Sequence, residues 1–453
     1  MHKRIANRRD IPSVTKVLDA LGAIDLPRPI IVDLVRLELS NVRGMDGVPA
    51  FQSIVDLVRR ALEVLRAGRV QRVINGTGIV IHTNFGRAPL APETIRALTE
   101  TGAGYSNLEF DLVTGARGKR GVYIENAIAV LCGAEAAAVV NNCAAALVLI
   151  VQHFTRAKSD VVISRGEILQ IGGGFRIGEI IESAGGKLRE VGATNKTTLN
   201  DYARAIGRDT ALVLKVHRSN FFMSGFVESP SSADIATLAR KKRVPFVEDL
   251  GSGAIVESEQ LGIAEHEPTP AEALKDGADL VCFSGDKLFG GPQAGIVAGK
   301  KRFVAALRRE PLFRALRCDK LCLAALQSTV DLHLDQSTSE IPALALLKIS
   351  KDELRARAAA IFTRLRGLPM QIAVGRGKAK VGGGTLPRSI MSSVTIDILP
   401  ESCSLTDFAA SLRASSPPVV GYIADDRLKL DLRTIFPQQD DLVVDAIRAA
   451  CTV

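Results

Sequence analysis

Three features are absent from this 453-residue sequence, and each absence excludes a class of protein. The longest apolar stretch is too short to cross a membrane, because Asn141 and Asn142 interrupt it. The basic first residues are not followed by an apolar leader segment, so we expect a cytoplasmic protein that has no contact with a membrane. The seven cysteines include no CxxC pair, and no zinc set completes Cys318 and Cys322, so we expect reduced thiols and no metal.

Complete nucleotide-binding loops are also missing. The segment "GPQAGIVAGKK" departs from the P-loop pattern, with Ala294 in place of the first glycine and Lys301 in place of Ser or Thr. The segments "IGGGFRIG" and "NGTGIVIH" each miss the last glycine of GxGxxG. The sequence therefore supports neither a P-loop ATPase nor a Rossmann dinucleotide site.

Positive charge is present in excess and is unevenly distributed. The formal net charge is +9, and the first 72 residues hold 13 Lys and Arg against eight Asp and Glu, a net of +5. A basic N-terminal module suggests a polyanionic partner such as RNA. A solvated helical surface explains the same charge, so charge alone leaves both interpretations open.

The pattern of apolar residues changes along the chain and predicts three domains. Residues 1–70 read as a small helical domain, because "SVTKVLDALGAI" and "SIVDLVRRALEVLRAG" carry apolar residues at helical spacing. Residues 71–332 alternate short β-rich runs such as "DVVIS", "TALVLKV" and "ADLVCFSG" with helix-length segments. That alternation is typical of an α/β fold with a doubly wound, mostly parallel sheet. Residues 333–453 suggest a smaller α+β domain.

Polar residues follow three of these predicted strands, at the edge where parallel sheets bind ligands. Lys287 follows "ADLVCFSG", Asp249 ends "VPFVED", and Asn141 and Asn142 follow "AAAVV" at the start of a helix. Pyridoxal 5'-phosphate fits this set: a lysine can bind its aldehyde and a buried carboxylate can keep its ring nitrogen protonated. Free N–H groups at a helix start can hold its phosphate.

Each of these residues has an ordinary explanation when it is taken alone. A strand-end Asp is often a turn residue, an Asn pair before a helix is often a cap, and a lone Lys often belongs to a loop. The combination in one chain order is more specific than its parts. We therefore predict that Lys287 binds the cofactor covalently.

Several longer strings make the sequence similar to a known family. They include "INGTGIVIHTNFGRAPL", "VVNNCAAALVLI", "VEDLGSG", "FSGDKLFGGPQAG" and "PLFRALRCDKLCLAALQSTV". With them the chain resembles the bacterial L-seryl-tRNA(Sec) selenium transferases, or selenocysteine synthases. The similarity runs from about residue 72 to the C-terminus. The N-terminal region matches the family in its length and position more than in its amino-acid sequence.

The resemblance implies a PLP-dependent transferase of fold type I. Members of this family use selenophosphate to turn serine attached to selenocysteine tRNA into selenocysteine. The resemblance also implies that the N-terminal domain binds the tRNA, which agrees with the basic charge there. It further implies a homo-oligomer, a ring of dimers.

The resemblance carries roles onto particular residues. It assigns the selenophosphate anion to Arg87, Arg314 and Arg317. It adds His217 and Arg165 as contacts of the cofactor, and Cys143 joins Asn141 and Asn142 in the phosphate loop. Two positions depart from the family pattern, since Cys143 stands where a third Asn is usual and Arg218 where Thr is usual. The second departure bears on substrate identity.

Two other functions remain open from the sequence. One is a paralogous PLP-dependent lyase that acts on a small phosphorylated amino acid or amino sugar acid and has no need of a basic RNA-binding domain. The other is a catalytically inert RNA-binding scaffold, which has no use for Lys287, Asp249 and Asn141.

Overall fold

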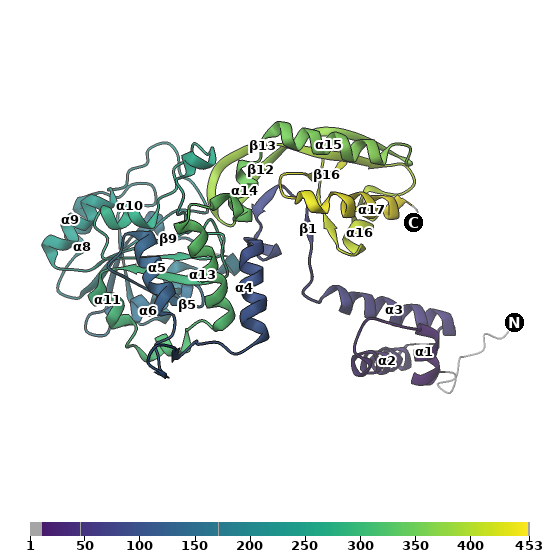
Figure 1. The fold of residues 1–453 in the computed structure, drawn as a ribbon, viewed down its shortest axis with the longest axis horizontal. Coiled ribbons are helices and arrows are strands. Elements are labelled where there is room, and N and C mark those ends of the chain that lie inside the picture. Colours follow the sequence, from purple (N-terminus) through teal and green to yellow (C-terminus); the bar gives the residue numbers. More distant parts are fainter. Residues whose placement is uncertain (1–10, 46, 171, 452–453) are drawn as a thin grey trace. The chain divides into compact units, whose positions relative to one another are not determined.

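The computed structural model describes residues 11–45, 47–170 and 172–451, and these residues fall into two compact units (Figure 1). One unit contains the chain up to Val73 together with Ala410–Val419. The other contains Ile74–Ala409 and Val420–Val453. No helix among the described residues is both long enough and apolar enough to span a membrane.

The first unit is built mainly from three helices, as the apolar spacing predicts. They are α1 (Val14–Leu21), α2 (Arg28–Arg43) and α3 (Phe51–Ala67). Ser13 caps α1, because its side chain accepts a hydrogen bond from the backbone N–H of Lys16 at 3.3 Å. Apolar residues at three- and four-residue spacing, among them Val35 and Val58, are buried between the helices.

A seven-stranded sheet forms the centre of the second unit. Its strands, in spatial order, are β5 (Ala136–Val140), β11 (Gly295–Gly299), β10 (Leu280–Ser284), β9 (Phe246–Gly251), β8 (Thr210–Val216), β6 (Asp160–Ser164) and β7 (Lys187–Val191). β11 pairs antiparallel with β10 and β5, and the pairs from β10 to β7 are all parallel. The five strands predicted from apolar runs are all present, whereas β7 and β11 were not predicted.

Helices cover both faces of this sheet. One face carries α5 (Val122–Cys132), α8 (Leu199–Ala205), α9 (Ser232–Lys242), α10 (Pro270–Lys275) and α13 (Lys320–Leu334). The other face carries α6 (Cys143–Phe154), α7 (Ile177–Ser183) and α11 (Lys301–Leu307). Each face buries its own apolar cluster, so the strands are apolar on both sides, as parallel strands usually are. This arrangement confirms the predicted α/β class.

A second sheet lies in the same unit and is built largely from the end of the chain. Its order is β15 (Tyr422–Ala424), β16 (Arg427–Asp431), β13 (Thr385–Pro400), β12 (Met370–Gly382) and β2 (Ile79–Ile81). Helices α14 (Pro342–Lys348), α15 (Lys351–Leu365) and α17 (Asp440–Cys451) accompany it. Three further helices are α4 (Pro92–Ala103), which packs on α13, α12 (Pro311–Ala315), which packs on the α6 face of the central sheet, and α16 (Leu405–Ala414), which is divided between the two units. Strand β2 precedes the strands of the central sheet in sequence, but it pairs with β12 of the second sheet. The chain therefore contributes to the second sheet both before and after it forms the central sheet.

Candidate active site

Lys287 lies three residues beyond the end of β10 and is half-buried. Its loop is tied to the neighbouring strand end, because the N–H of Leu288 donates to the carbonyl of Ser252 at 3.0 Å. Gly251 faces the lysine: a Cβ at that glycine would lie 3.7 Å from Nζ, and its φ of +65° favours glycine. The end of β9 therefore leaves room beside the amine of Lys287.

Asp249 lies next to this lysine on β9, in register with Cys282 of β10. Its side chain is only 7% exposed, and Oδ1 accepts hydrogen bonds from the N–H of Gly251 at 3.1 Å and the thiol of Cys143 at 3.6 Å. Burial raises the pKa of Asp249, whereas the positive charge of Lys287 lowers it. The two predicted catalytic residues are thus brought together as an electrostatically coupled pair.

The predicted phosphate loop lies at the start of α6. Asn142 caps this helix, with its Oδ1 accepting from the N–H of Ala145 at 2.8 Å, and Cys143 is the first helical residue. The backbone N–H of Asn141 donates to the carbonyl of Leu316 at 2.8 Å. A Cβ at Gly295 would come within 2.0 Å of the Asn142 carbonyl oxygen, so β11 passes too close for any larger residue. The helix start is therefore fixed beside Asp249, with its first turn able to bind an anion.

His217 follows β8 and belongs to the same strand-end group. Its backbone N–H donates to the carbonyl of Asp249 at 2.8 Å, and its ring Nε2 lies 3.3 Å from Oε1 of the buried Glu267. Arg165 follows β6, but its guanidinium pairs with Glu190 of β7 at 2.7 Å and is more than half exposed. The structure thus brings His217 to Asp249 and gives Arg165 a partner outside this group.

Arg87 is placed beside the lysine loop, although it lies 199 residues earlier than its partner. Its Nη1 contacts both carboxylate oxygens of Asp286, the residue directly before Lys287, at 2.9 and 2.8 Å. The N–H of Ala88 also donates to the carbonyl of Asp286 at 3.2 Å. One of the three predicted anion-binding arginines is therefore held at the lysine.

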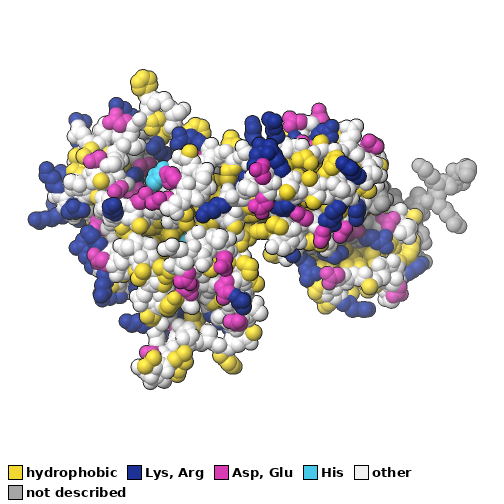
Figure 2. Space-filling view, turned by 45° about the horizontal axis from the view of Figure 1, so that its top comes forward, with side chains coloured by type: hydrophobic (Ala, Val, Ile, Leu, Met, Phe, Trp, Pro, Cys, Tyr) yellow, Lys and Arg dark blue, Asp and Glu magenta, His cyan; other side chains and the backbone are white. Residues whose placement is uncertain are grey.

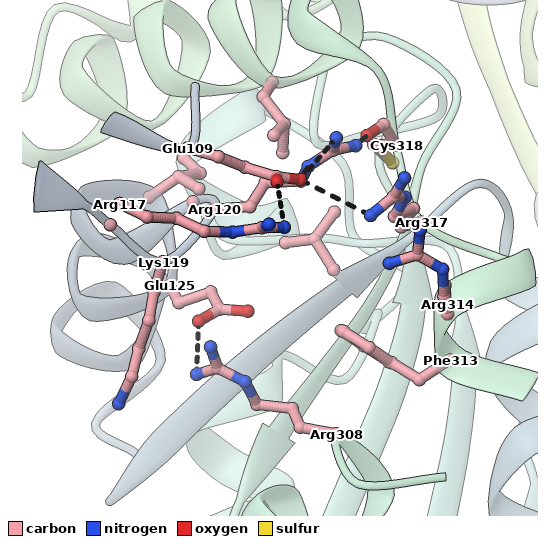
Figure 3. Close-up of a pocket in the computed structure, with 15 residues that line it drawn as sticks. Glu109, Arg117, Lys119, Arg120, Glu125, Arg308, Phe313, Arg314, Arg317 and Cys318 are labelled. Carbon is pink, nitrogen blue, oxygen red and sulfur yellow. Dashed lines mark hydrogen bonds and ion pairs between the residues drawn. The ribbon is translucent and has the colours of Figure 1, made fainter. Parts of the chain in front are cut away.

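The other two arginines line a separate pocket of about 280 Å³ between α5 and α12 (Figure 3). Arg314 lies beside Arg317 on its wall, but α12 ends at Ala315, so Arg317 lies beyond the helix and the two do not share one helix face. Glu109 contacts Arg317 at 3.4 Å and binds Arg120 at 2.8 Å and Arg117 at 2.9 Å. The hydrogen bond from Arg120 is the main cause that lowers the pKa of Glu109. Neither Arg87 nor Lys287 is among the described residues that line this pocket.

A second carboxyl group in this pocket, that of Glu125, has a raised pKa. Glu125 lies on α5, is 8% exposed and pairs with Nη1 of Arg308 at 2.5 Å. Burial raises its pKa to about 7, and Arg308 counteracts only part of that effect. The pocket therefore gains negative charge as the pH rises through neutrality.

Sequence reasoning missed four side chains that support these residues. They are Asp286 for Arg87, Glu267 for His217, Glu109 for Arg317, and Cys282 beneath Asp249. Cys282 lies with Cys143 and Asp249 in a group whose donor atoms are all within 4.8 Å of one another. Asp286 stands inside the string "SGDK" and Cys282 in the predicted strand before it, whereas Glu267 and Glu109 come from distant segments.

The central sheet carries a lysine after β10, a carboxylate on β9 and a helix start after β5 at one edge. This arrangement defines an enzyme with the fold of the fold type I PLP-dependent enzymes. In line with this, the solved structure of D-glucosaminate-6-phosphate ammonia-lyase matches with a TM-score of 0.58, covering 84% of this chain and 96% of that one. The two are 20% identical, so that likeness concerns the fold alone.

The family follows from sequence comparison. The family model described as L-seryl-tRNA selenium transferase matches residues 73–436. The L-seryl-tRNA(Sec) selenium transferase of Carboxydothermus hydrogenoformans is 43% identical over 446 residues, covering 96% of this chain and 95% of that protein. The one of Geotalea uraniireducens is 42% identical over 457 residues, covering 97% and 98%. The chain belongs to the L-seryl-tRNA selenium transferase family.

Proposed function

We propose that this protein converts L-seryl-tRNA(Sec) to L-selenocysteinyl-tRNA(Sec), with pyridoxal 5'-phosphate as cofactor and selenophosphate as selenium donor. Relatives of that name, 42–43% identical over nearly their whole length, support the reaction. The observation that carries the proposal is the group formed by Lys287, Asp249 and the start of α6 at one edge of the central sheet. The N-terminal unit binds the tRNA in this proposal, and the chain forms a homo-oligomeric ring of dimers.

The residues at these strand ends fit pyridoxal phosphate. Lys287 supplies an amine with open space beside it at Gly251, and Asp249 supplies a buried carboxylate for a ring nitrogen. The first turn of α6 supplies backbone N–H groups for the phosphate, so Cys143 in place of Asn still serves through its backbone. When bound, the cofactor supplies an electron-withdrawing ring that eases loss of the α-proton of the seryl group.

The chain's own groups then move protons and orient reactants. The amine of Lys287 takes the α-proton and is close enough to Asp249 for the two charges to stabilise each other. Hydrogen bonds from Gly251 and Cys143 fix the orientation of the Asp249 carboxylate. His217 is fixed between Asp249 and Glu267, which suits a side chain that packs against the cofactor, and Arg165 is a further candidate contact.

The selenium donor is an anion and requires fixed cations. Arg87 brings one guanidinium to the lysine loop, and Arg314 and Arg317 add two at the neighbouring pocket. Guanidinium groups suit phosphate oxygens because they donate two parallel hydrogen bonds. In this proposal Arg87 orients selenophosphate at the lysine loop, and Arg314 and Arg317 bind the anion at their own pocket.

The lyase alternative is less well supported. Its solved example shares 20% identity with this chain, whereas the selenium transferases share more than twice that. The two activities differ in their products, because a lyase releases ammonia from a free small molecule. Assays with seryl-tRNA(Sec) and with phosphorylated amino sugar acids separate them.

The proposal is tested by incubating the purified protein with cofactor, seryl-tRNA(Sec) and selenophosphate, then identifying the amino acid released from the tRNA. We expect selenocysteine from the natural protein and none from Lys287→Ala. Lys348→Ala, which removes an exposed lysine of α14, is the control and should be fully active. Borohydride reduction followed by peptide mapping should place the cofactor on Lys287. A cofactor found on another lysine, or serine alone on the tRNA after incubation with the natural protein, contradicts the proposal.

A further inference from the structure

Two basic runs that the proposed reaction does not use meet at one pocket of the second unit. The first run, Arg240–Arg243, ends α9, and the second, Lys300–Arg302, begins α11. Arg240, Arg243, Lys300 and Arg302 all line a pocket of about 710 Å³. We call these four residues the basic pocket. On the face shown in Figure 2, Lys and Arg side chains gather at the end of the unit where Figure 1 places α9 and α11.

The cations of the basic pocket are largely unneutralised. Lys300 pairs with Asp279 at 2.5 Å, and Asp279 is the only carboxylate among the described lining residues. Within the described parts of the chain, Arg240, Arg243 and Arg302 have no carboxylate partner. All three are exposed. The pocket therefore presents three guanidinium groups that remain available to a ligand.

Local structure holds these cations in place. Arg243 ends α9 in the left-handed conformation, with φ +56°, and the last turn of α9 is basic throughout. Cations at a helix C-terminus are favoured by the helix dipole, which stabilises those of α9, whereas Lys300 and Arg302 lie at the start of α11, where the dipole disfavours cations. The guanidinium of Arg302 lies over the ring of Phe303, 4.4 Å from its centroid. The cations thus surround the pocket on two rigid helix ends.

The position and composition of the pocket indicate what it binds. It lies where β9 begins, at the edge of the sheet opposite to Lys287, so its ligand is not a reactant at the catalytic lysine. The described lining residues are mainly cations and apolar groups, with Asp279 as their one carboxylate. Guanidinium groups donate paired hydrogen bonds to phosphate oxygens, so the pocket suits phosphate groups, which carry no sequence information.

The charge balance of the chain points the same way. The first 72 residues account for +5 of the net +9, so the remaining residues carry +4. The rest of the chain is therefore also net positive, which is compatible with a second anion-binding surface. We propose that the basic pocket binds the phosphate backbone of the tRNA substrate, away from its aminoacyl end. This inference rests on the proposed function, since it assigns a second contact surface for the same RNA.

The test compares two triple variants of the full-length protein. The first, Arg240→Ala/Arg243→Ala/Arg302→Ala, removes the free guanidinium groups of the basic pocket. The matched control, Arg189→Ala/Arg208→Ala/Arg366→Ala, removes three exposed arginines of the same unit that have no ion pair among the described residues. Binding of selenocysteine tRNA is measured over a salt series, and the absorbance of bound cofactor checks that both variants are folded.

We expect the basic-pocket variant to bind tRNA roughly 10- to 100-fold more weakly at 0.1 M salt, with a salt slope smaller by about 2 to 3. The control variant should change the slope by less than about 1. Inorganic phosphate at equal ionic strength should not compete, because one free anion cannot replace a run of phosphodiesters. Equal effects of the two variants overturn the inference, because they mean that net charge alone matters. Full competition by inorganic phosphate also overturns it in favour of a small-anion site.

Failure of this inference is distinguishable from failure of the proposed function. If the natural protein binds the tRNA and makes selenocysteine while the basic-pocket variant binds equally well, only the surface is wrong. If the natural protein does not bind the tRNA, both the proposed function and the surface are refuted.

Discussion

Arg87 and Asp286 form a clamp across 199 residues of sequence, in which one guanidinium nitrogen contacts both carboxylate oxygens at 2.9 and 2.8 Å. Asp286 directly precedes Lys287, and Arg87 adopts a left-handed backbone conformation with φ +67°. A residue other than glycine rarely adopts this conformation, so the surrounding contacts must hold it. The clamp fixes Arg87, the proposed anion-binding arginine, to the loop of Lys287.

Replacing Asp286 by Asn should therefore disturb both stability and donor binding. We expect a loss of about 1–3 kcal/mol in the free energy of unfolding, because a largely buried carboxylate pair is broken. We also expect a higher KM for selenophosphate, because Arg87 loses its orientation. The control is Asp352→Asn, whose exposed pair with Arg355 should contribute less than about 0.5 kcal/mol. An unchanged KM in Asp286→Asn contradicts the positioning role.

Asp249→Asn should separate cofactor binding from turnover. The substitution keeps the shape of the side chain but removes the charge that keeps a ring nitrogen protonated. We expect turnover to fall by about 100-fold or more, while the Kd for cofactor rises by less than about 10-fold. Glu248→Gln is the control, because Glu248 is buried on the opposite face of β9, where it contacts Ser232. Near-normal turnover in Asp249→Asn would exclude the assigned role.

Glu125 should make the stability of the protein depend on pH between about 4.5 and 7. Its pKa is raised to about 7 in the folded protein, so the folded state holds its proton more tightly than the unfolded state. The natural protein should therefore lose up to about 3 kcal/mol from this group as the pH rises through that window. Glu125→Gln cannot ionise and should not show that loss. Urea unfolding of both proteins at several pH values measures the difference, which should stay constant above about pH 8; a difference independent of pH contradicts it.

Much of the central sheet could be predicted from sequence, because fully buried parallel strands read as continuous apolar runs. The runs around Val162, Leu214 and Val281 are such strands. β7 escaped prediction because "KLREV" is mostly exposed and reads as polar. β12 was not predicted, since its solvent-facing positions break the apolar pattern.

The site was predictable where a role depends on strand order, and not where it depends on contacts between distant segments. Lys287, Asp249 and Asn142 each follow or end a strand, so their common edge follows from a parallel sheet. The pairing of Arg165 with Glu190 was not predictable, because β6 and β7 had not been recognised as neighbours. Glu109 likewise gave no signal, since its three arginine partners gather only in the folded protein.

The N-terminal unit should contribute to tRNA binding without supporting the fold of the catalytic unit. The two apolar clusters of the central sheet contain no residue before Ile124, so removal of residues up to Gly68 should leave that sheet folded with its cofactor. We expect weaker tRNA binding and a smaller salt slope in the truncated protein, because fewer phosphates are neutralised.

A second variant distinguishes an RNA-binding role of the N-terminal unit from a role in oligomer assembly. Arg59, Arg60 and Arg66 are exposed on α3, so replacing all three by Ala removes charge while the helices remain. If the unit binds RNA, this variant keeps its oligomer size by light scattering but binds tRNA with a slope reduced by up to about 3. If the unit serves only assembly, truncation changes the oligomer, and filter binding shows unchanged affinity per subunit in both proteins. That second result would refute the RNA role, because backbone contacts with a structured tRNA depend on these cations.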